Sequence, residues 1–271
     1  MDGQQRLRAC FDYIKGLFPL TLDTPQSWSG KRFDELLPDE KKRIYNYNFI
    51  VRVLPEVPEE ELRKLFSRLN QNVVALNQQE LRHATYSGPF IKTMDTIADN
   101  PGWSKVDLFT ANDIRRMIDV EFVSELAIAI LHGPQNKKDS LEEWYQTYEE
   151  SFPQRADVEK AFARTLELVD EILPTASGLR WTKKSDFYTL FCVLNKLPSA
   201  GSLSAAAKES LGKALREFAA EVDAVLDGAL PTSEEVALYV HGVQRAASDR
   251  GNRRKREENL IDYLKAHQLW T

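Results

Sequence analysis

Cysteine is scarce in this chain, which has only Cys10 and Cys192 among its 271 residues. The two lie far apart and form no CxxC motif, so we interpret them as reduced core thiols of a cytosolic protein. No apolar run is long enough to cross a bilayer, and Arg6 and Arg8 interrupt the region where a signal peptide would be apolar. We therefore expect a soluble, cytoplasmic protein of bacterial type with no membrane partner.

Histidine is also scarce, and the four histidines stand apart from one another. No His/Cys spacing suits zinc, and the chain has no GxxxxGK[ST] loop, no GxGxxG or GxSxG motif and no His-rich nuclease motif. An excess of positive charge is missing as well, because the net charge is −5 and the pI is about 5.6. We therefore expect no zinc and no general polyanion binding, and any nucleic-acid contact must come from a local basic patch.

Over most of its length, the chain has apolar residues at the spacing of amphipathic helices. The segment 47–54 is the one convincing strand, since aromatic and β-branched residues recur there at every second position. We predict an α+β fold that is predominantly α-helical. A break near residue 133 predicts two parts, a mixed part over 1–133 and an all-helical part over 134–271. Residues 112–131 are predicted to form one long helix.

The first stretch with chemical potential is Asp2-Gly3-Gln4-Gln5-Arg6, a polar cluster directly before a helical pattern. A helix N-terminus offers unpaired N–H groups and a positive dipole end, and Gly3 lets an oxygen-bearing ligand approach. Arg6 adds a bidentate donor suited to phosphate. Asp2 could hold a metal ion such as magnesium, orient water or cap the helix. The alternative is a simple N-cap aspartate with a surface arginine.

The second stretch places Arg68, Asn70, Asn77, Glu80 and Arg82 around one predicted turn between helices. Such a polar turn can line a pocket or can lock the loop through bonds to its own backbone. For Asn77 and Glu80 we favour helix capping, because their spacing is that of a capping box. For Arg68 and Asn70 both interpretations stay open.

The third stretch carries Arg115, Arg116, Asp119 and Glu121 on one predicted helix. We favour a solvated helix face, in which charges pair at i and i+4 as Arg115 and Asp119 would.

The fourth stretch is a basic run that could grip DNA phosphates, although it has no interleaved aromatic residues. A solvated charged face explains it equally well. The run consists of Arg250, Arg253, Arg254, Lys255 and Arg256.

Four motifs in this order resemble the ParB/sulfiredoxin-like N-terminal domain of GmrSD-type restriction endonucleases. A later charged helix, RRMIDVEFVSEL, is similar to the R-x-x-D-x-E helix of that family, and the resemblance covers residues 1 to about 130. The motifs are DGQQRL at residues 2–7, FSRLN at 66–70, LNQQELR at 76–82 and YSGPF at 86–90.

The resemblance implies a partial ParB-like α/β portion over residues 1–133 and a helical remainder. It also implies binding and hydrolysis of an NTP with magnesium, coupled to restriction of modified or foreign DNA or to phage defence. Carried over by position, residues 2–6 form the nucleotide side, with Asp2 and Arg6 catalytic. Arg68 and Asn70 form a second wall. Cleavage in such proteins belongs to a separate HNH-type nuclease domain or partner, and no nuclease is expected in this chain.

One departure from the family concerns the start of the chain. In the family the DGQQR turn follows a strand, whereas here Met1 stands at that position. We expect that an internal methionine was taken as the start, the alternative being a truncated gene. The competing functions are then an NTPase, a nucleotide-gated or nucleotide-free DNA-binding or scaffold module without turnover, and an inert helical remnant.

Overall fold

The computed structural model describes residues 4–20, 28–49, 76–136, 140–174, 178–198, 202–244 and 246–270, with only the backbone described for residues 4–6. The chain divides into two compact units, residues 1–75 and 76–271, and each is described by itself. The predicted division at residue 133 lies inside the second unit. There, buried residues of α8 (Ile118–His132) pack in one core with those of α11 (Lys184–Lys196).

Secondary structure in these ranges is helical, and no strand occurs in them. The predicted predominance of helix is confirmed, whereas the β part of the predicted α+β fold is not observed. Tyr47 to Phe49 are irregular, and the rest of the predicted strand lies outside the described residues. The rings of Tyr47 and Phe49 lie 5.0 Å apart and pack on each other. A segment with alternating residue types becomes a β-strand only when a neighbouring strand is available for hydrogen bonding.

In the described residues of the first unit, two α-helices lie around a small core. Its helix α1 (Gln4–Ile14) is followed by Gly16, whose φ of 74° suits glycine. Helix α2 (Pro38–Tyr45) has Pro38 at its first turn, where a missing N–H costs nothing. The buried residues that hold this unit are Tyr13, Phe33 and Leu36.

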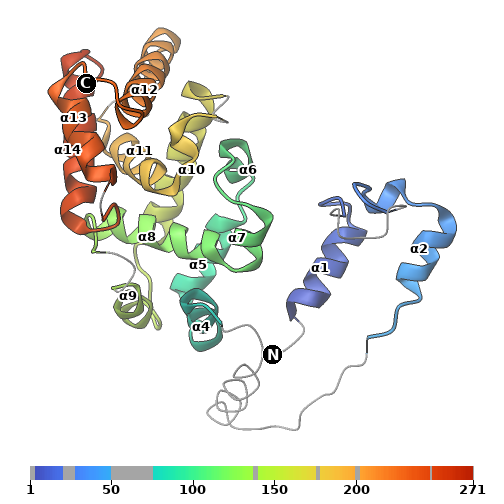
Figure 1. The fold of residues 1–271 in the computed structure, drawn as a ribbon. Coiled ribbons are helices and arrows are strands. Elements are labelled where there is room, and N and C mark those ends of the chain that lie inside the picture. Colours follow the sequence, from blue (N-terminus) through green and yellow to red (C-terminus); the bar gives the residue numbers. More distant parts are fainter. Residues whose placement is uncertain are drawn as a thin grey trace. The chain divides into compact units, whose positions relative to one another are not determined.

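The second unit is a layered assembly of helices in which α8 and α11 occupy the middle (Figure 1). Within the ranges given above, every helix is too short or too polar to traverse a bilayer. The surrounding helices are α4 (Gln78–Thr85), α5 (Pro89–Ala98), α6 (Gly102–Val106), α7 (Ala111–Arg115), α9 (Leu141–Thr147), α10 (Arg155–Ile172), α12 (Ala205–Leu226), α13 (Glu234–Gln244) and α14 (Arg250–Ala266).

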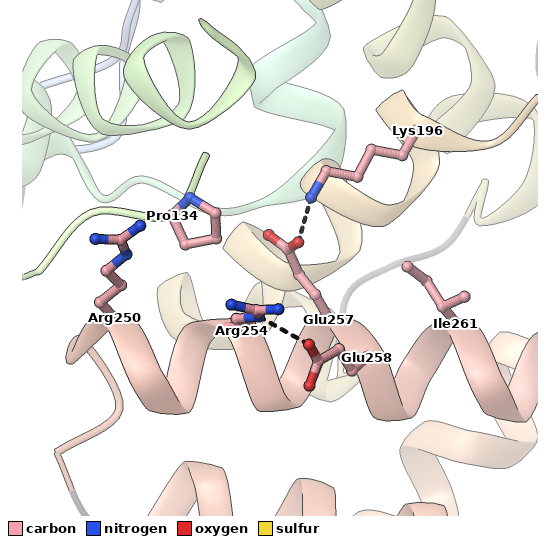
Figure 2. A pocket seen from close by; sticks show the side chains of 7 residues that line it. All are labelled: Pro134, Lys196, Arg250, Arg254, Glu257, Glu258 and Ile261. Carbon is pink, nitrogen blue, oxygen red and sulfur yellow. Dashed lines mark hydrogen bonds and ion pairs between the residues drawn. The ribbon is translucent and has the colours of Figure 1, made fainter. Parts of the chain in front are cut away.

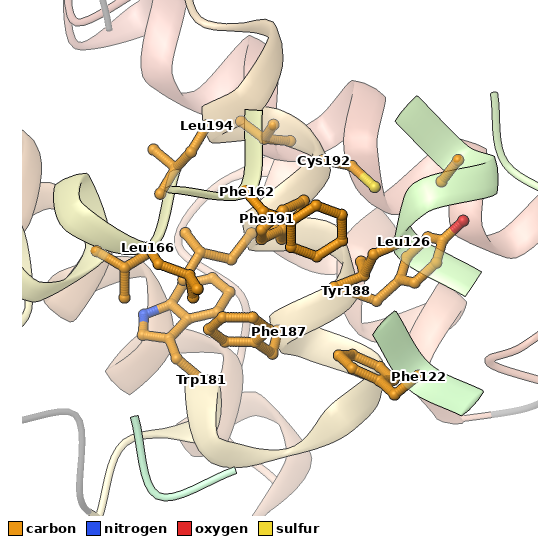
Figure 3. Packing of buried hydrophobic residues seen from close by; sticks show 14 of the residues in the cluster. Phe122, Leu126, Phe162, Leu166, Trp181, Phe187, Tyr188, Phe191, Cys192 and Leu194 are labelled. Carbon is orange, nitrogen blue, oxygen red and sulfur yellow. The ribbon is translucent and has the colours of Figure 1, made fainter. Parts of the chain in front are cut away.

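The core of this unit is built on aromatic side chains from several helices (Figure 3). Phe187 of α11 is fully buried and has ring contacts with Trp103 at 5.8 Å and with Phe122 at 6.4 Å. Helices α8 and α11 are apolar on nearly all sides, which is the pattern of a helix surrounded by others. Polar residues on these two helices are therefore drawn into the interior.

The predicted single helix over residues 112–131 is interrupted. Helix α7 ends at Arg115 and α8 begins at Ile118, because Met117 between them adopts a left-handed conformation with φ of 54°. A left-handed non-glycine residue costs conformational energy that helix periodicity does not reveal. The break redirects the chain just before the charged residues of α8.

Candidate functional site

The predicted nucleotide site lies mostly outside the described residues. Asp2 and Gly3, the predicted metal and phosphate contacts, are outside, and so are Arg68 and Asn70 of the second wall. Residues 4–6 open helix α1, and only their backbone is described. The structure thus provides one feature of this site, helix α1, which is described from Gln4 onward.

The LNQQELR motif starts helix α4 with a capping box, as predicted. Asn77 Oδ1 accepts a hydrogen bond from the Glu80 backbone N–H at 2.8 Å, and the Asn77 N–H donates to Glu80 Oε2 at 2.8 Å. Arg116 then pairs with Glu80 at 3.1 Å, and the Asn77 amide donates to the Arg116 carbonyl at 2.7 Å. The capping interpretation is confirmed, and it ties the start of α4 to the turn between α7 and α8.

The rest of the same motif forms a buried network, so Arg82 locks this segment in place and does not line a pocket. The Arg82 guanidinium donates to Glu121 at 3.2 Å and to Glu142 at 3.3 Å, and Gln79 donates to the Tyr145 hydroxyl at 2.8 Å. Burial raises the pKa of Tyr145 to about 12, so its hydroxyl stays neutral. Because these groups satisfy one another, they fasten α4 to α8 and α9.

The YSGPF motif is explained by a carboxylate from elsewhere in the unit. The backbone N–H groups of Ser87 and Gly88 donate to the two Glu149 oxygens, each at 3.0 Å. A Cβ on Gly88 would lie 1.9 Å from the Glu149 carbonyl oxygen, so only glycine fits. The anion-binding start of α5 is therefore already occupied by the protein's own Glu149.

The charged residues at the start of α8 do not form the solvated face that was expected. Asp119 and Glu121 are buried, although Arg115 is exposed, because α8 lies between α4, α5 and α11. Asp119 Oδ1 has no hydrogen-bond partner among the described residues. Burial raises the pKa of Asp119 to about 6, and the nearby Asp99 and Asp95 carboxylates add to the shift.

The predicted basic run is divided by the phase of helix α14. Arg253 is buried, pairs with Glu125 and lies over the Tyr188 ring at 4.1 Å. Arg256 is fully buried and donates to Thr189 at 3.0 Å. Neither side chain is placed to reach a DNA phosphate. The members of the run that remain exposed are Arg250, Arg254 and Lys255.

A cavity of about 270 Å³ lies against this helix in the second unit (Figure 2). Its buried wall is Glu257, one carboxylate oxygen of which pairs with Lys196. The other oxygen, Oε1, has no hydrogen-bond partner in the described part of the chain. On the open side, Arg254 pairs with Glu258 at 2.8 Å. The lining residues are Pro134, Lys196, Arg250, Arg254, Glu257, Glu258 and Ile261.

Part of this cavity could have been found in the sequence. Residues 250, 254, 257 and 261 are spaced as one helix face, so a helical reading of the basic run separates them from the buried arginines. Lys196 could not have been found, because it comes from α11, 61 residues away from Glu257 along the chain.

No group of three His, Cys, Asp or Glu side chains in the described ranges is arranged to hold a metal ion. The predicted magnesium contact, Asp2, lies outside those ranges. Comparisons of the chain with protein-family models, with curated proteins and with solved structures gave no match.

Proposed function

We propose that this protein is an NTP-binding and NTP-hydrolysing component of a DNA restriction or phage-defence system in the bacterial cytoplasm. The nucleotide phosphates would contact the turn at Gly3 and the Arg6 guanidinium. Asp2 would hold magnesium or orient the attacking water. An HNH-type nuclease partner would cut the modified or foreign DNA.

The observation that supports this proposal is helix α1, which is described from Gln4 onward and holds Arg6 in helical backbone. The first N–H groups of a helix have no partner within the helix, and the helix dipole makes that end positive. A helix that starts within the DGQQR motif would therefore give this motif an anion-binding terminus, as a phosphate site requires. The order of the four motifs along the chain supports the same proposal.

Release of inorganic phosphate from ATP and GTP in the presence of magnesium tests the enzyme. The Arg6→Ala variant is expected to lower turnover by about tenfold or more, because it removes a charge-assisted contact to phosphate. The matched control is Arg8→Ala, which removes the same charge two residues later on α1 and should keep full turnover. Absence of phosphate release from the unmodified chain would overturn the proposal, and equal loss in both variants would overturn the role of Arg6.

The second candidate function is a DNA-binding module without turnover. The observation favouring it is the exposed set of Arg250, Arg254 and Lys255 at the start of α14. Neutralising Arg254 and Lys255 together should weaken duplex DNA binding and reduce the slope of log affinity against log salt by about 2. Binding that persists in this variant with an unchanged salt slope would exclude this face.

A further inference from the structure

Helix α2 of the first unit is short and has no buried residue. The side that it turns towards the rest of its unit carries the partly exposed Glu40, Lys41 and Ile44. Large apolar side chains are exposed at both of its ends, because Leu37 at the N-cap is 62 % exposed and Tyr45 at the last position is 64 % exposed. A helix of eight residues is marginal in water on its own, so α2 gains stability from any surface that covers these ends.

The charged residues between the two ends are also without partners. Asp39 lies in the first turn of α2, and Lys42 and Arg43 lie in the last turn. All three are exposed, and their side chains have no hydrogen bond or ion pair among the residues that the structure describes. Lys41 is different, since it donates to the Asp34 carbonyl at 2.7 Å within its own unit. The helix dipole favours this distribution of charge, but it does not explain the exposed apolar ends.

Residues 37–45 have a self-complementary order of side chains. The stretch is Leu-Pro-Asp-Glu-Lys-Lys-Arg-Ile-Tyr, in which two apolar residues stand at each end, two acids precede the central lysine and two bases follow it. If two copies of α2 lie antiparallel about a twofold axis at their midpoint, Asp39 of each copy faces Arg43 of the other. Leu37 of each copy then faces Tyr45 of the other. Every contact occurs twice, as an isologous interface requires.

The residues after α2 add apolar surface at its Tyr45 end. The Tyr47 N–H donates to the Ile44 carbonyl at 3.2 Å, which keeps Tyr47 beside the end of the helix. Tyr47 and Phe49 are exposed. With Leu37 and Tyr45 they offer on the order of 400 Å² of apolar surface in each copy, counting about 100 Å² for each half-exposed side chain. This area is at the low end for specific interfaces, so we expect a weak dimer that depends on concentration.

A second copy fits this face better than a nucleic acid does. Exposed aromatic rings next to Lys42 and Arg43 are a feature of surfaces that bind single strands. Asp39, however, lies one turn before Arg43 on the exposed side of α2 and would repel phosphate, and Leu37 has no flat ring to stack on a base. Both residues have a matching partner in a second copy of α2.

We propose that residues 37–45 form a homodimer contact in which two α2 helices pair antiparallel. Asp39 of each copy pairs with Arg43 of the other, and Leu37 packs against Tyr45. This contact is no part of the proposed nucleotide site and does not depend on NTP turnover.

Sedimentation velocity of the full chain tests the contact. The chain is expected to change from mostly monomer at about 1 µM to mostly dimer at about 200 µM. Arg43→Glu and Asp39→Lys each place like charges at two contacts, so each should weaken dimerisation by about tenfold or more. The matched control is Lys255→Glu, which reverses an exposed charge in the second unit and should change dimerisation by less than about twofold.

A mixture of the two variants gives the sharpest test. One copy with Arg43→Glu and one with Asp39→Lys bring opposite charges together at both contacts, so the mixture should form dimers although neither variant does so alone. The double variant Asp39→Lys/Arg43→Glu should also recover dimerisation. Both substituted side chains are exposed, and circular dichroism confirms that the variants are folded.

The outcomes that contradict the proposal are distinct. A chain that stays monomeric at all concentrations would overturn it and would leave this face to other residues of the chain or to a nucleic acid. A dimer that persists unchanged in Arg43→Glu, or variants that do not recover on mixing, would overturn the antiparallel pairing of α2.

Discussion

Replacing Asp119 by asparagine should stabilise the protein at neutral pH and have no stabilising effect near pH 4. Burial raises the pKa of this carboxyl from 3.8 to about 6, and Asp99 and Asp95 contribute. A raised acid pKa means that the folded state binds the proton more tightly than the unfolded state does. The protonated Asp119 carboxyl therefore leaves the folded state at its full stability below about pH 4, and this stability is lost as the pH rises towards about 6.

The size of the effect follows from the shift of roughly two units. At about 1.4 kcal/mol per unit, ionised Asp119 costs at most about 3 kcal/mol above pH 6. The Val120 N–H favours the ionised form, and the neutral asparagine oxygen would accept this hydrogen bond more weakly than a carboxylate does. We therefore expect a net gain of about 1–2 kcal/mol at pH 7.5.

Urea unfolding of the unmodified chain and of Asp119→Asn at several pH values between about 4 and 8 measures this difference. Asp113→Asn is the control of opposite sign. Burial alone would raise the pKa of Asp113, but hydrogen bonds from Lys184 and Thr110 outweigh it and lower the pKa. That variant should be less stable than the unmodified chain by a constant amount above about pH 4, and the difference should shrink as the pH falls through the lowered pKa of Asp113. A gain for Asp119→Asn that is the same at pH 4 and pH 8, or a loss at pH 8, would refute the reasoning.

Three further predictions use the same unfolding assay or a thiol reagent. Arg82→Ala should lower the free energy of unfolding by about 3–5 kcal/mol, because it removes a buried guanidinium that pairs with the buried Glu121 carboxylate; a loss under 1 kcal/mol would contradict the network. Gly88→Ala should destabilise by more than about 2 kcal/mol, since its Cβ would meet the Glu149 carbonyl, whereas Gly251→Ala, with open space around its Cβ, should stabilise by about 0.5 kcal/mol. Cys192 is buried and its thiol pKa is raised well above the usual value, so it should react with Ellman's reagent only after unfolding; rapid reaction in the folded state would contradict this burial.

The ends of helices in this protein could be predicted where the interactions that fix them join residues close together in the sequence. The capping box of Asn77 and Glu80 and the glycine after α1 involve only neighbouring residues, and both were predictable. The break at Met117 was not, because packing imposes a left-handed conformation against local preference. The expected strand was not predictable for the same reason, since alternating residue types in one segment do not show whether a second strand lies beside it.

The fate of charged side chains was the hardest part to predict. Asp119, Glu121 and Arg253 look like surface residues in the sequence, yet each is buried. Burial became acceptable through distant partners for Glu121 and Arg253, 39 and 128 residues away along the chain. The cavity has the same origin, because Lys196 and Glu257 meet only in the folded unit. Periodicity can assign such residues to a helix face, but it cannot say what covers that face.

Which arginines of helix α14 point into the core depends on the number of residues between them as well as on their identity. Each added residue turns the helix by about 100°, so one insertion between Arg250 and Arg256 would exchange inward and outward arginines. Guanidinium groups now held by Glu125 and Thr189 would then face water, and Arg254 would face a core with no acceptor. Mutational scans of stability should therefore show a segment that tolerates substitution at Arg254 and Lys255 and rejects any single-residue insertion or deletion.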